Sequence, residues 1–243
     1  MKHWILFGAW LALAAGIGTA AAQEPRKDWA RFGRYEQANA ELKASGTTPD
    51  AVFLGNSITD NWARYDAEFF SRNRFAGRGI SGQTTSEMLV RFRQDVIELH
   101  PRVVLIMAGT NDIAQNNGYI TPEHTLGNIV SMVELARAND IRVILCSVPP
   151  AVDFRWRPGL EPAQKIVRRN ALIRQYAEEQ GVPYLDYWSA LADPRGGMPA
   201  KWCDDEVHPN LNCYIEVFEP MALEAVNRVL QTRKSYITPL PQQ

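Results

Sequence analysis

The stretch Val103–Asp112, with the sequence VVLIMAGTND, decides the fold. Its first five residues are apolar and largely β-branched, which is typical of a strand that is buried on both faces. Small and polar residues follow from Gly109 and end the strand in a turn. Four other short apolar runs, each bounded by Gly, Pro or Asn, predict further strands: Val52–Leu54, Phe75–Ile80, Ile141–Cys146 and Val182–Leu185.

Segments with helical periodicity alternate with these strands, since their apolar residues recur three and four positions apart. The predicted helices are Trp29–Ala44, Thr84–Leu99, Thr121–Asn139, Pro162–Gln180 and Cys213–Gln231. Buried strands that alternate with helices favour a parallel sheet covered on both faces. We therefore predict an α/β fold of three layers, with a doubly wound, flavodoxin-like sheet of about five parallel strands.

The composition fits one globular domain and excludes several classes of function. Of the 243 residues, 46% are hydrophobic, which is enough for one sizeable core. Lys and Arg number 26 and Asp and Glu 27, so the formal charge of -1 provides no basic field for nucleic acid or an acidic membrane. A small, neutral or weakly charged substrate fits better. Because the chain has no repeat or linker, residues 23–243 are predicted to form a single domain.

The first 22 residues have the pattern of a secretory signal peptide. Lys2 gives a short positive start, Trp4–Gly18 is almost wholly apolar, and Ala20–Ala22 supplies the small residues of a cleavage site before Gln23. An uncleaved membrane anchor is the alternative. No Cys stands at the cleavage point, so the pattern of a bacterial lipoprotein is missing. We expect a secreted or periplasmic protein that does not associate with a membrane after cleavage.

Export permits disulfide bonds, but the three cysteines cannot all pair. Cys146 lies in a predicted strand and fits a buried thiol. Cys203 and Cys213 flank a short loop, and the spacing leaves open whether they form a bridge. No cluster of Cys or His has the spacing of metal ligands, so we predict neither a metal ion nor a cofactor.

A doubly wound sheet places its chemistry at the carboxyl ends of the strands. Three predicted strands are followed there by small polar segments, Gly55–Ser57, Ser81–Gln83 and Gly109–Asp112. A fourth polar segment, Asp205–Asn210, belongs to a loop late in the chain. These four segments are the candidates for a site.

Histidines narrow the choice further, because only four exist. His3 belongs to the signal peptide, His100 precedes a strand at the amino end of the sheet, and His124 lies in the first turn of a helix. Only His208 has a carboxylate, Asp205, three residues earlier in a turn, where it can orient the ring as a general base. The alternative is a surface pair that merely caps the turn.

Ser57 is the candidate nucleophile, at the end of the first strand and the start of a helix, where its amide can serve an oxyanion. The alternative is an ordinary helix cap. Thr59 occupies the last position of what would be a Gly-x-Ser-x-Gly elbow, so the α/β-hydrolase pattern fails.

Taken together, the four segments resemble the motif blocks of the SGNH hydrolases, also called GDSL-type esterases and lipases. The blocks are Gly55–Ile58, Gly79–Gly82, Gly109–Asp112 and Asp205–Pro209, in the order that the family has them. The chain is most similar to a secreted bacterial branch that resembles platelet-activating-factor acetylhydrolase subunits and carbohydrate acetylesterases. One departure is Asn56, where the family signature has Asp.

The resemblance implies a role for individual residues. Ser57 would be the nucleophile, His208 the base and Asp205 the orienting acid. The oxyanion hole would consist of the backbone amides of Ser57 and Gly82 and the side-chain amide of Asn111. The alternatives are that Gly82 only shapes a turn and that Asn111 only caps a helix. Asp112 is expected to have a structural role.

A second pattern overlaps one of these blocks. Gly77–Gly82 has the spacing of a dinucleotide-binding fingerprint. It overlaps the end of a strand and does not open the first strand-to-helix turn, and the next strand ends in Met107–Gly109, where an acidic residue would be needed for the ribose. We therefore do not expect a nicotinamide cofactor.

Candidate substrate contacts are Asn56, Trp62, Trp156 and Trp202, since the three Trp residues lie near predicted loops on the side of the site. No long lid or apolar insertion is present, which favours short acyl groups. The predicted function is hydrolysis of short-chain, preferably acetyl, esters on small molecules or glycans. The alternatives are a lysophospholipase or thioesterase of the same family and, more remotely, a carbohydrate-binding protein without catalysis. The oligomeric state remains open.

Overall fold

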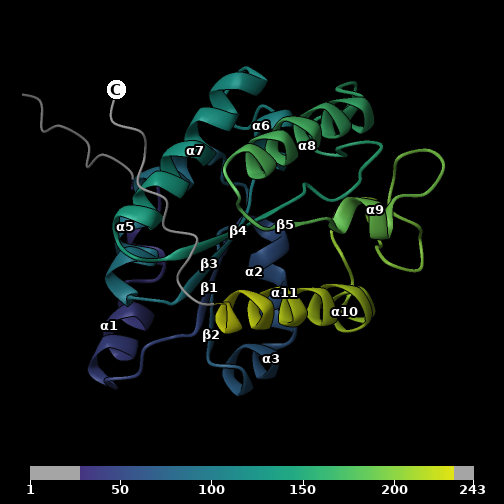
Figure 1. Cartoon of the computed structure of the whole chain (residues 1–243). Coiled ribbons are helices and arrows are strands. Elements are labelled where there is room, and N and C mark those ends of the chain that lie inside the picture. The colour runs from purple at the N-terminus through teal and green to yellow at the C-terminus, as the bar shows by residue number, and fades with distance from the viewer. Residues whose placement is uncertain (1–27, 233–243) are drawn as a thin grey trace, which may run out of the picture.

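The computed structural model describes residues 28–232, which form a five-stranded sheet between two layers of helices (Figure 1). The strands are β1 (Ala51–Gly55), β2 (Phe75–Gly79), β3 (Val103–Met107), β4 (Arg142–Cys146) and β5 (Tyr184–Leu185). All neighbouring strands are parallel, and their order is β2-β1-β3-β4-β5. This is the flavodoxin-like order, so the predicted fold class is confirmed.

The helices account for most of the remaining chain. In chain order they are α1 (Glu36–Ala44), α2 (Ser57–Tyr65), α3 (Ala67–Arg72), α4 (Thr85–Val90), α5 (Phe92–Asp95), α6 (Thr110–Ile113), α7 (Pro122–Ala138), α8 (Pro162–Glu179), α9 (Tyr187–Leu191), α10 (Leu211–Cys213) and α11 (Glu219–Gln231), with short 3-10 turns at Phe32–Arg34 and Ile97–Leu99 and a π-helical segment at Tyr214–Phe218. Among these described helices, none has the length and apolar character needed to cross a bilayer.

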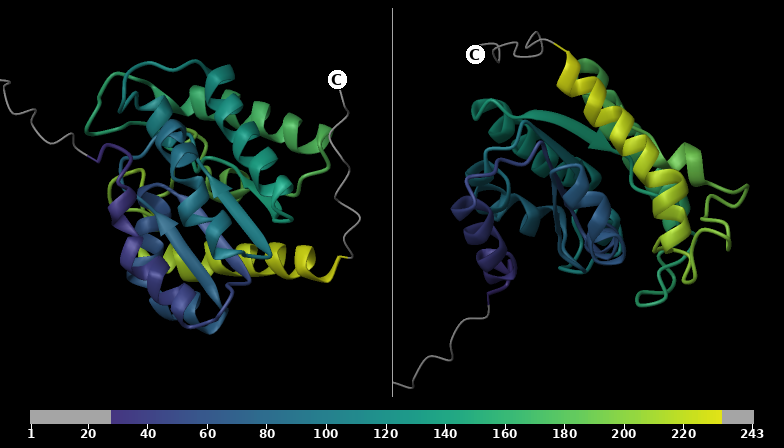
Figure 2. Two further views of the ribbon diagram at one scale, coloured as in Figure 1. Left: turned by 90° about the vertical axis from the view of Figure 1, so that its left-hand side faces the viewer. Right: turned by 90° about the horizontal axis from the view of Figure 1, so that it is seen from below.

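Alternate residues of each central strand face the two halves of the core. In β3, Val103, Leu105 and Met107 pack with α2, α3 and α11, whereas Val104 and Ile106 pack with α4, α7 and α8. Figure 1 shows α11 on one side of the strands and α7 and α8 on the other, and Figure 2 shows the same layers from two further directions. Two cores that share one sheet explain why the central strands β1 and β3 are apolar and buried throughout.

Several predicted helix and strand boundaries were wrong. The segment Thr84–Leu99 is not one helix but α4, α5 and a 3-10 turn, and the chain departs from helical geometry at Val96. This break lets Val96 and Ile97, which are adjacent in sequence, both be buried, whereas one straight helix would bury a single stripe. The predicted helix from Trp29 starts only at Glu36, because Arg31 adopts a left-handed conformation.

The other two boundary errors lie later in the chain. Strand β5 is shorter than predicted and follows Pro183, which has no N–H for a ladder. The last predicted helix, from Cys213, starts earlier, at Leu211, and passes through the π-helical segment before α11.

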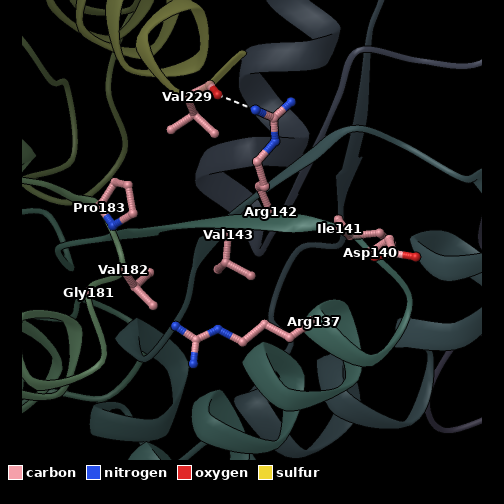
Figure 3. Close-up of a pocket in the computed structure, with 9 residues that line it drawn as sticks. All are labelled: Arg137, Asp140, Ile141, Arg142, Val143, Gly181, Val182, Pro183 and Val229. Atoms are coloured by element: carbon pink, nitrogen blue, oxygen red, sulfur yellow. Dashed lines mark hydrogen bonds between the residues drawn. The ribbon is translucent and has the colours of Figure 1, made fainter. Parts of the chain in front are cut away.

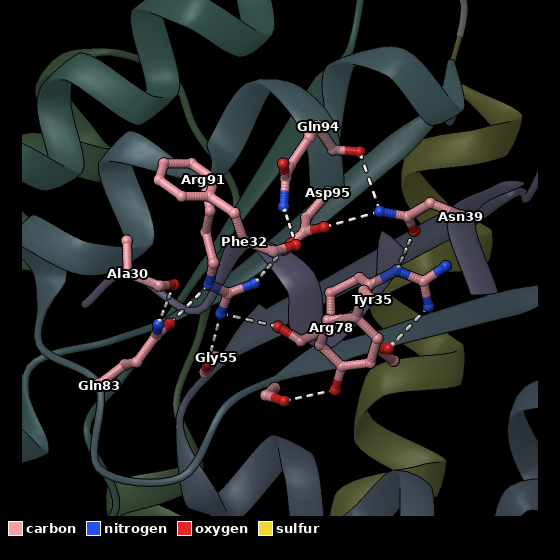
Figure 4. A network of polar contacts seen from close by, with 12 residues as sticks. Ala30, Phe32, Tyr35, Asn39, Gly55, Arg78, Gln83, Arg91, Gln94 and Asp95 are labelled. Carbon is pink, nitrogen blue, oxygen red and sulfur yellow. Dashed lines mark hydrogen bonds and ion pairs between the residues drawn. The ribbon is translucent and has the colours of Figure 1, made fainter. Parts of the chain in front are cut away.

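A buried arginine ties the carboxyl ends of β1 and β2 together (Figure 4). Arg91 has no exposed surface, and its Nη2 donates to the backbone oxygens of Gly55 and Arg78, both at 3.0 Å. Its Nε donates to Gln83 Oε1 at 2.6 Å and its Nη1 to Asp95 Oδ2 at 2.9 Å. Each of its three nitrogens thus has an acceptor, which is what makes a buried guanidinium tolerable. Arg91 therefore fixes the strand ends next to the polar segments at Ser57 and Gly82.

Candidate active site

Ser57 lies at the carboxyl end of β1 as the first residue of α2. The helix packs closely on the strand, since a Cβ on Gly55 would lie 2.0 Å from Thr59 Oγ1. Glycine is thus required at position 55 by the close packing of the helix on the strand. Because Ser57 begins the helix, its backbone N–H has no acceptor within the helix.

Asn56 caps this helix and is not a substrate contact, so that prediction was wrong. Its Oδ1 accepts the backbone N–H of Ile58 at 3.1 Å, and only 1% of the residue is exposed. The capping oxygen is common to Asn and Asp, which explains why Asn fits where the family signature has Asp.

The structure brings together the three side chains of the predicted triad. Ser57 Oγ is 2.8 Å from His208 Nε2, and His208 Nδ1 is 2.6 Å from Asp205 Oδ2. In the tautomer that suits this geometry, Nδ1–H donates to Asp205 and Nε2 accepts the Ser57 hydroxyl. Ser57 and His208 are 151 residues apart in sequence, so the contact is made by the fold and not by a local turn. The arrangement can deprotonate Ser57.

The carboxylate of Asp205 is fixed by its own loop. Its Oδ1 accepts the backbone N–H groups of Val207 at 3.0 Å and of His208 at 2.7 Å. Partial burial acts to raise the pKa of Asp205, but these hydrogen bonds and the one from the His208 ring outweigh it, and the pKa lies below its usual value. Asp205 therefore stays ionised and holds the imidazole in place.

The other two predicted oxyanion donors, Gly82 and Asn111, lie in the same hollow as Ser57 and follow β2 and β3. Gly82, after β2, has a φ of +84°, a backbone conformation that residues other than glycine rarely adopt. Asn111 lies inside α6 after β3, so it does not cap that helix, whose N-cap is Gly109. Its Nδ2 donates to the Gln83 oxygen at 2.9 Å and keeps a second N–H. Both residues line the same hollow as Ser57.

Asp112 is turned away from this hollow. Only 1% of it is exposed, and it accepts hydrogen bonds from the backbone N–H of Thr85 at 3.0 Å and from Thr85 Oγ1 at 2.5 Å. Burial raises the pKa of Asp112, and the hydrogen bonds from Thr85 only partly oppose this. Asp112 thus joins α6 to α4, as a structural residue.

Two open hollows meet at His208. The first, of about 350 Å³, is lined by Ser57, Asn61, Ser81, Gly82, Asn111, Asn116, Trp156 and His208. The second, of about 470 Å³, shares Asn61 and His208 and extends along Tyr65, Asp204, Asp205, Pro209, Asn210 and Leu211. Ser57 lines the first hollow and His208 lines both, so the two hollows together leave room beside the imidazole for an acyl group and an alcohol. Asn61 and Asn116 also line the first hollow although no sequence motif marks them, whereas Ser81 belongs to a motif block.

The three predicted Trp contacts occupy different surroundings. Trp156 is 44% exposed, and its ring centroid is 6.3 Å from that of His208. Trp62 is only 1% exposed and stacks between Phe69 and Tyr214, so its prediction as a substrate contact was wrong. The buried residues of α2 are Ile58, Thr59 and Trp62, so Trp62 lies on the face that packs into the core. Trp202 packs at the edge of that core and lines neither hollow at His208. Its role as a substrate contact stays a prediction.

The cysteines offer no competing nucleophile. All three cysteines, Cys146, Cys203 and Cys213, are buried free thiols. Cys203 and Cys213 therefore do not form the disulfide bridge that the sequence left open. Burial raises the pKa of all three, that of Cys213 to about 12. Within residues 28–232, no group of three or more His, Cys, Asp or Glu is placed to hold a metal ion.

Another hollow lies at the amino ends of β4 and β5, at the opposite edge of the sheet (Figure 3). It measures about 40 Å³ and is lined by Arg137, Asp140, Ile141, Arg142, Val143, Gly181, Val182, Pro183 and Val229. Arg142 Nη1 donates to the backbone oxygen of Val229 there. None of these nine residues is a Ser, Cys or His, so this hollow does not offer the same chemistry.

Comparison with known proteins gives a consistent picture. The sequence profile of the GDSL-like lipase/acylhydrolase family matches residues 53–214. The uncharacterized lipoprotein YqeF of Bacillus subtilis (strain 168) is 28% identical over 137 residues, which are 49% of this chain and 56% of that protein. This chain thus spans little more than half of that relative's length.

Solved structures match over nearly their whole length. A candidate acylhydrolase from Bacteroides fragilis NCTC 9343 is 45% identical, with a TM-score of 0.80 over 85% of this chain and 100% of that one. A GDSL-like lipase from Bacteroides thetaiotaomicron VPI-5482 is 41% identical, with a TM-score of 0.77 over 82% and 98%. The acetylxylan esterase Axe2 of Geobacillus stearothermophilus is 19% identical, with a TM-score of 0.57 over 77% and 96%, and shares the fold alone.

Proposed function

This chain belongs to the GDSL-like lipase/acylhydrolase family of carboxylic ester hydrolases, and from that premise we propose that it is a serine esterase that removes short acyl groups, above all acetyl, from carbohydrate esters. The observation that carries the proposal is the contact of Ser57 Oγ with His208 Nε2 at 2.8 Å, beside the contact of His208 Nδ1 with Asp205 at 2.6 Å.

The proposed reaction has two halves. Ser57 Oγ attacks the ester carbonyl while His208 Nε2 accepts its proton, and the charge on the carbonyl oxygen is stabilised by the N–H groups of Ser57, Gly82 and Asn111. The tetrahedral intermediate collapses, and His208 donates the proton to the departing alcohol. Water, deprotonated by His208, then attacks the acyl-enzyme and releases the acid and free Ser57. Asp205 holds the ring for both halves and stays ionised.

The lining of the first hollow favours a short acyl group. Of its eight residues, Ser57, Asn61, Ser81, Asn111 and Asn116 carry hydroxyl or amide groups, and only Trp156 presents a large apolar surface. A long acyl chain needs a continuous apolar groove to leave water, because its transfer free energy scales with buried apolar area. An acetyl group needs no such groove.

Trp156 supports a carbohydrate as the alcohol part. Its ring is exposed beside His208, and Asn and Ser groups surround it. A flat aromatic face with hydrogen-bonding groups around it suits a sugar ring, which has apolar C–H faces and hydroxyl edges. An acetylxylan esterase shares the fold, so the scaffold is compatible with this substrate class.

Release of acid from a panel of esters tests this proposal. We expect acetate release from acetylated xylo-oligosaccharides and turnover of p-nitrophenyl acetate and butyrate, with kcat/KM falling steeply towards the octanoate. Trp156→Ala should raise KM for the acetylated glycan more than for p-nitrophenyl acetate. Greater activity on octanoate or on lysophospholipid would favour the lysophospholipase alternative, and preference for acyl thioesters would favour the thioesterase. Binding of the glycan without any turnover would indicate a carbohydrate-binding protein.

We also propose that residues 1–22 direct export and are removed. They lie outside the described residues, and the support is the sequence pattern together with the lipoprotein relative. Because this chain has no Cys at the cleavage point, release in soluble form is proposed and not lipid anchoring. Amino-terminal sequencing of the exported protein should begin at Gln23.

A further inference from the structure

We propose that Asn116 is a positioning residue that aligns two of the three oxyanion donors, and that Trp156 sets the orientation of Asn116. This inference rests on the proposed esterase function. Asn116 lies outside the motif blocks, beyond the end of α6, yet its side chain lies in the same hollow as Ser57.

The side chain of Asn116 connects the loops that follow β2 and β3. Its Nδ2 donates to the backbone oxygen of Gly82 and to Oδ1 of Asn111, both at 3.0 Å. Gly82 would otherwise have the wide conformational freedom of glycine, and Asn111 could turn its amide by 180° and present an oxygen to the oxyanion. The two hydrogen bonds restrain Gly82 and, together with the hydrogen bond from Asn111 Nδ2 to the Gln83 oxygen at 2.9 Å, determine that Asn111 presents an N–H group.

Trp156 determines which end of the Asn116 amide makes these bonds. Its Nε1–H donates to Asn116 Oδ1 at 3.1 Å. A flipped amide would place Nδ2–H against the indole N–H and would lose all three hydrogen bonds. Trp156 is itself supported by Phe154, which is fully buried and stacks on it with a centroid distance of 5.0 Å. A chain of contacts thus leads from the core through the exposed indole to the oxyanion donors.

The consequence is that Trp156 should contribute to kcat even for an ester that is too small to cover its ring. Donors that are aligned before the reaction stabilise the charge that develops in the transition state, and misaligned donors do not. A residue that only packs substrate would change KM. The N–H of Trp156 and its aromatic face therefore have separable effects.

Kinetics with p-nitrophenyl acetate test this proposal. We expect Asn116→Ala to lower kcat about 10- to 100-fold with little change in KM, which is the range for weakening one or two oxyanion donors. Trp156→Phe keeps the ring and removes the N–H, and it should lower kcat about 3- to 10-fold. The double variant, with both Asn116→Ala and Trp156→Phe, should be no slower than Asn116→Ala alone, because both changes act on one chain of contacts.

The matched control is Asn117→Ala. Asn117 is exposed in the same loop, and its Nδ2 donates to Thr84 Oγ1 at 3.2 Å, away from the hollow. We expect it to keep the parental kcat. A purely structural role of the loop would give equal losses of kcat in Asn116→Ala and Asn117→Ala. Independent roles of Asn116 and Trp156 would give additive losses of kcat in the double variant. Either outcome would overturn the proposal, as would an unchanged kcat in Asn116→Ala. Ser57→Ala distinguishes a failure of this inference from a failure of the proposed function. If Ser57→Ala retains turnover, the proposed function itself fails; if it is inactive, any failure concerns Asn116 alone.

Discussion

Changing Asp205 to Asn alters one end of the carboxylate and leaves the volume of the side chain nearly unchanged. The Asn oxygen can keep the two backbone hydrogen bonds that Oδ1 now accepts from Val207 and His208, at 3.0 and 2.7 Å, so the loop should stay folded. The Asn nitrogen would then replace Oδ2, which now lies 2.6 Å from His208 Nδ1. It would donate a hydrogen bond to Nδ1 and shift the ring proton to Nε2.

An imidazole with its proton on Nε2 cannot accept the proton of Ser57, even if the ring does not move. We expect kcat for p-nitrophenyl acetate to fall by about 10³- to 10⁴-fold, which corresponds to about 4–5.5 kcal/mol of activation free energy. The melting temperature should be unchanged. The loss should be smaller than for Ser57→Ala or His208→Ala, because the nucleophile and the base both remain.

The neighbouring carboxylate supplies the control. Asp204 is exposed and lines the second hollow, so Asp204→Asn should leave kcat unchanged. A fully active Asp205→Asn protein, or a loss confined to Asp204→Asn, would refute the reasoning about ring orientation.

Three further predictions follow from the surroundings of single residues. EDTA should leave turnover unchanged, because the proposed reaction uses Ser57 and His208 and no metal ion; loss of turnover in EDTA and its rescue by zinc would instead indicate a metal-activated water. Trp62→Ala should cost about 3–5 kcal/mol of unfolding free energy and lower the melting temperature by roughly 10 °C, because it opens a cavity in the aromatic core; unchanged stability with a raised KM would return Trp62 to the substrate site. Burial raises the pKa of Glu219 from 4.5 to about 7, so its contribution to stability is complete below pH 4.5 and is lost as pH rises through 7. The loss is at most about 3 kcal/mol of unfolding free energy. Glu219→Gln should abolish this loss, as measured by urea unfolding of both proteins at pH 5 and pH 8.

The parallel sheet made much of this arrangement predictable. Once Val103–Met107 and its counterparts are recognised as strands, the residues after Gly55, Ile80 and Ala108 must converge on one edge, because the carboxyl ends of parallel strands meet there. The chain order of the motifs was therefore enough to predict that Ser57, Gly82 and Asn111 lie together. To predict that His208 joins them, it was enough to assume that its loop returns to this edge of the sheet.

Burial was not predictable from the same patterns. Trp62 follows Ser57 by five residues, and the sequence alone does not reveal that the packing of α2 turns it into the core. Asn56 was assigned to substrate because the family motif surrounds it, although its side chain closes the helix end. Asn116 carries no signal of its own, since two of its three hydrogen-bond partners, Gly82 and Trp156, lie 34 and 40 residues away in sequence and only the folded chain brings them to it.

The identity of the nucleophile is tested most directly by covalent labelling. Diethyl p-nitrophenyl phosphate should place one diethylphosphoryl group on the peptide that contains Ser57, with loss of esterase activity in proportion to labelling, as measured by mass spectrometry of the intact and digested protein. The Ser57→Ala protein should fold normally, take up no label and turn over p-nitrophenyl acetate at least about ten-thousandfold more slowly. Labelling at another residue, or near-normal turnover by folded Ser57→Ala protein, would contradict the account.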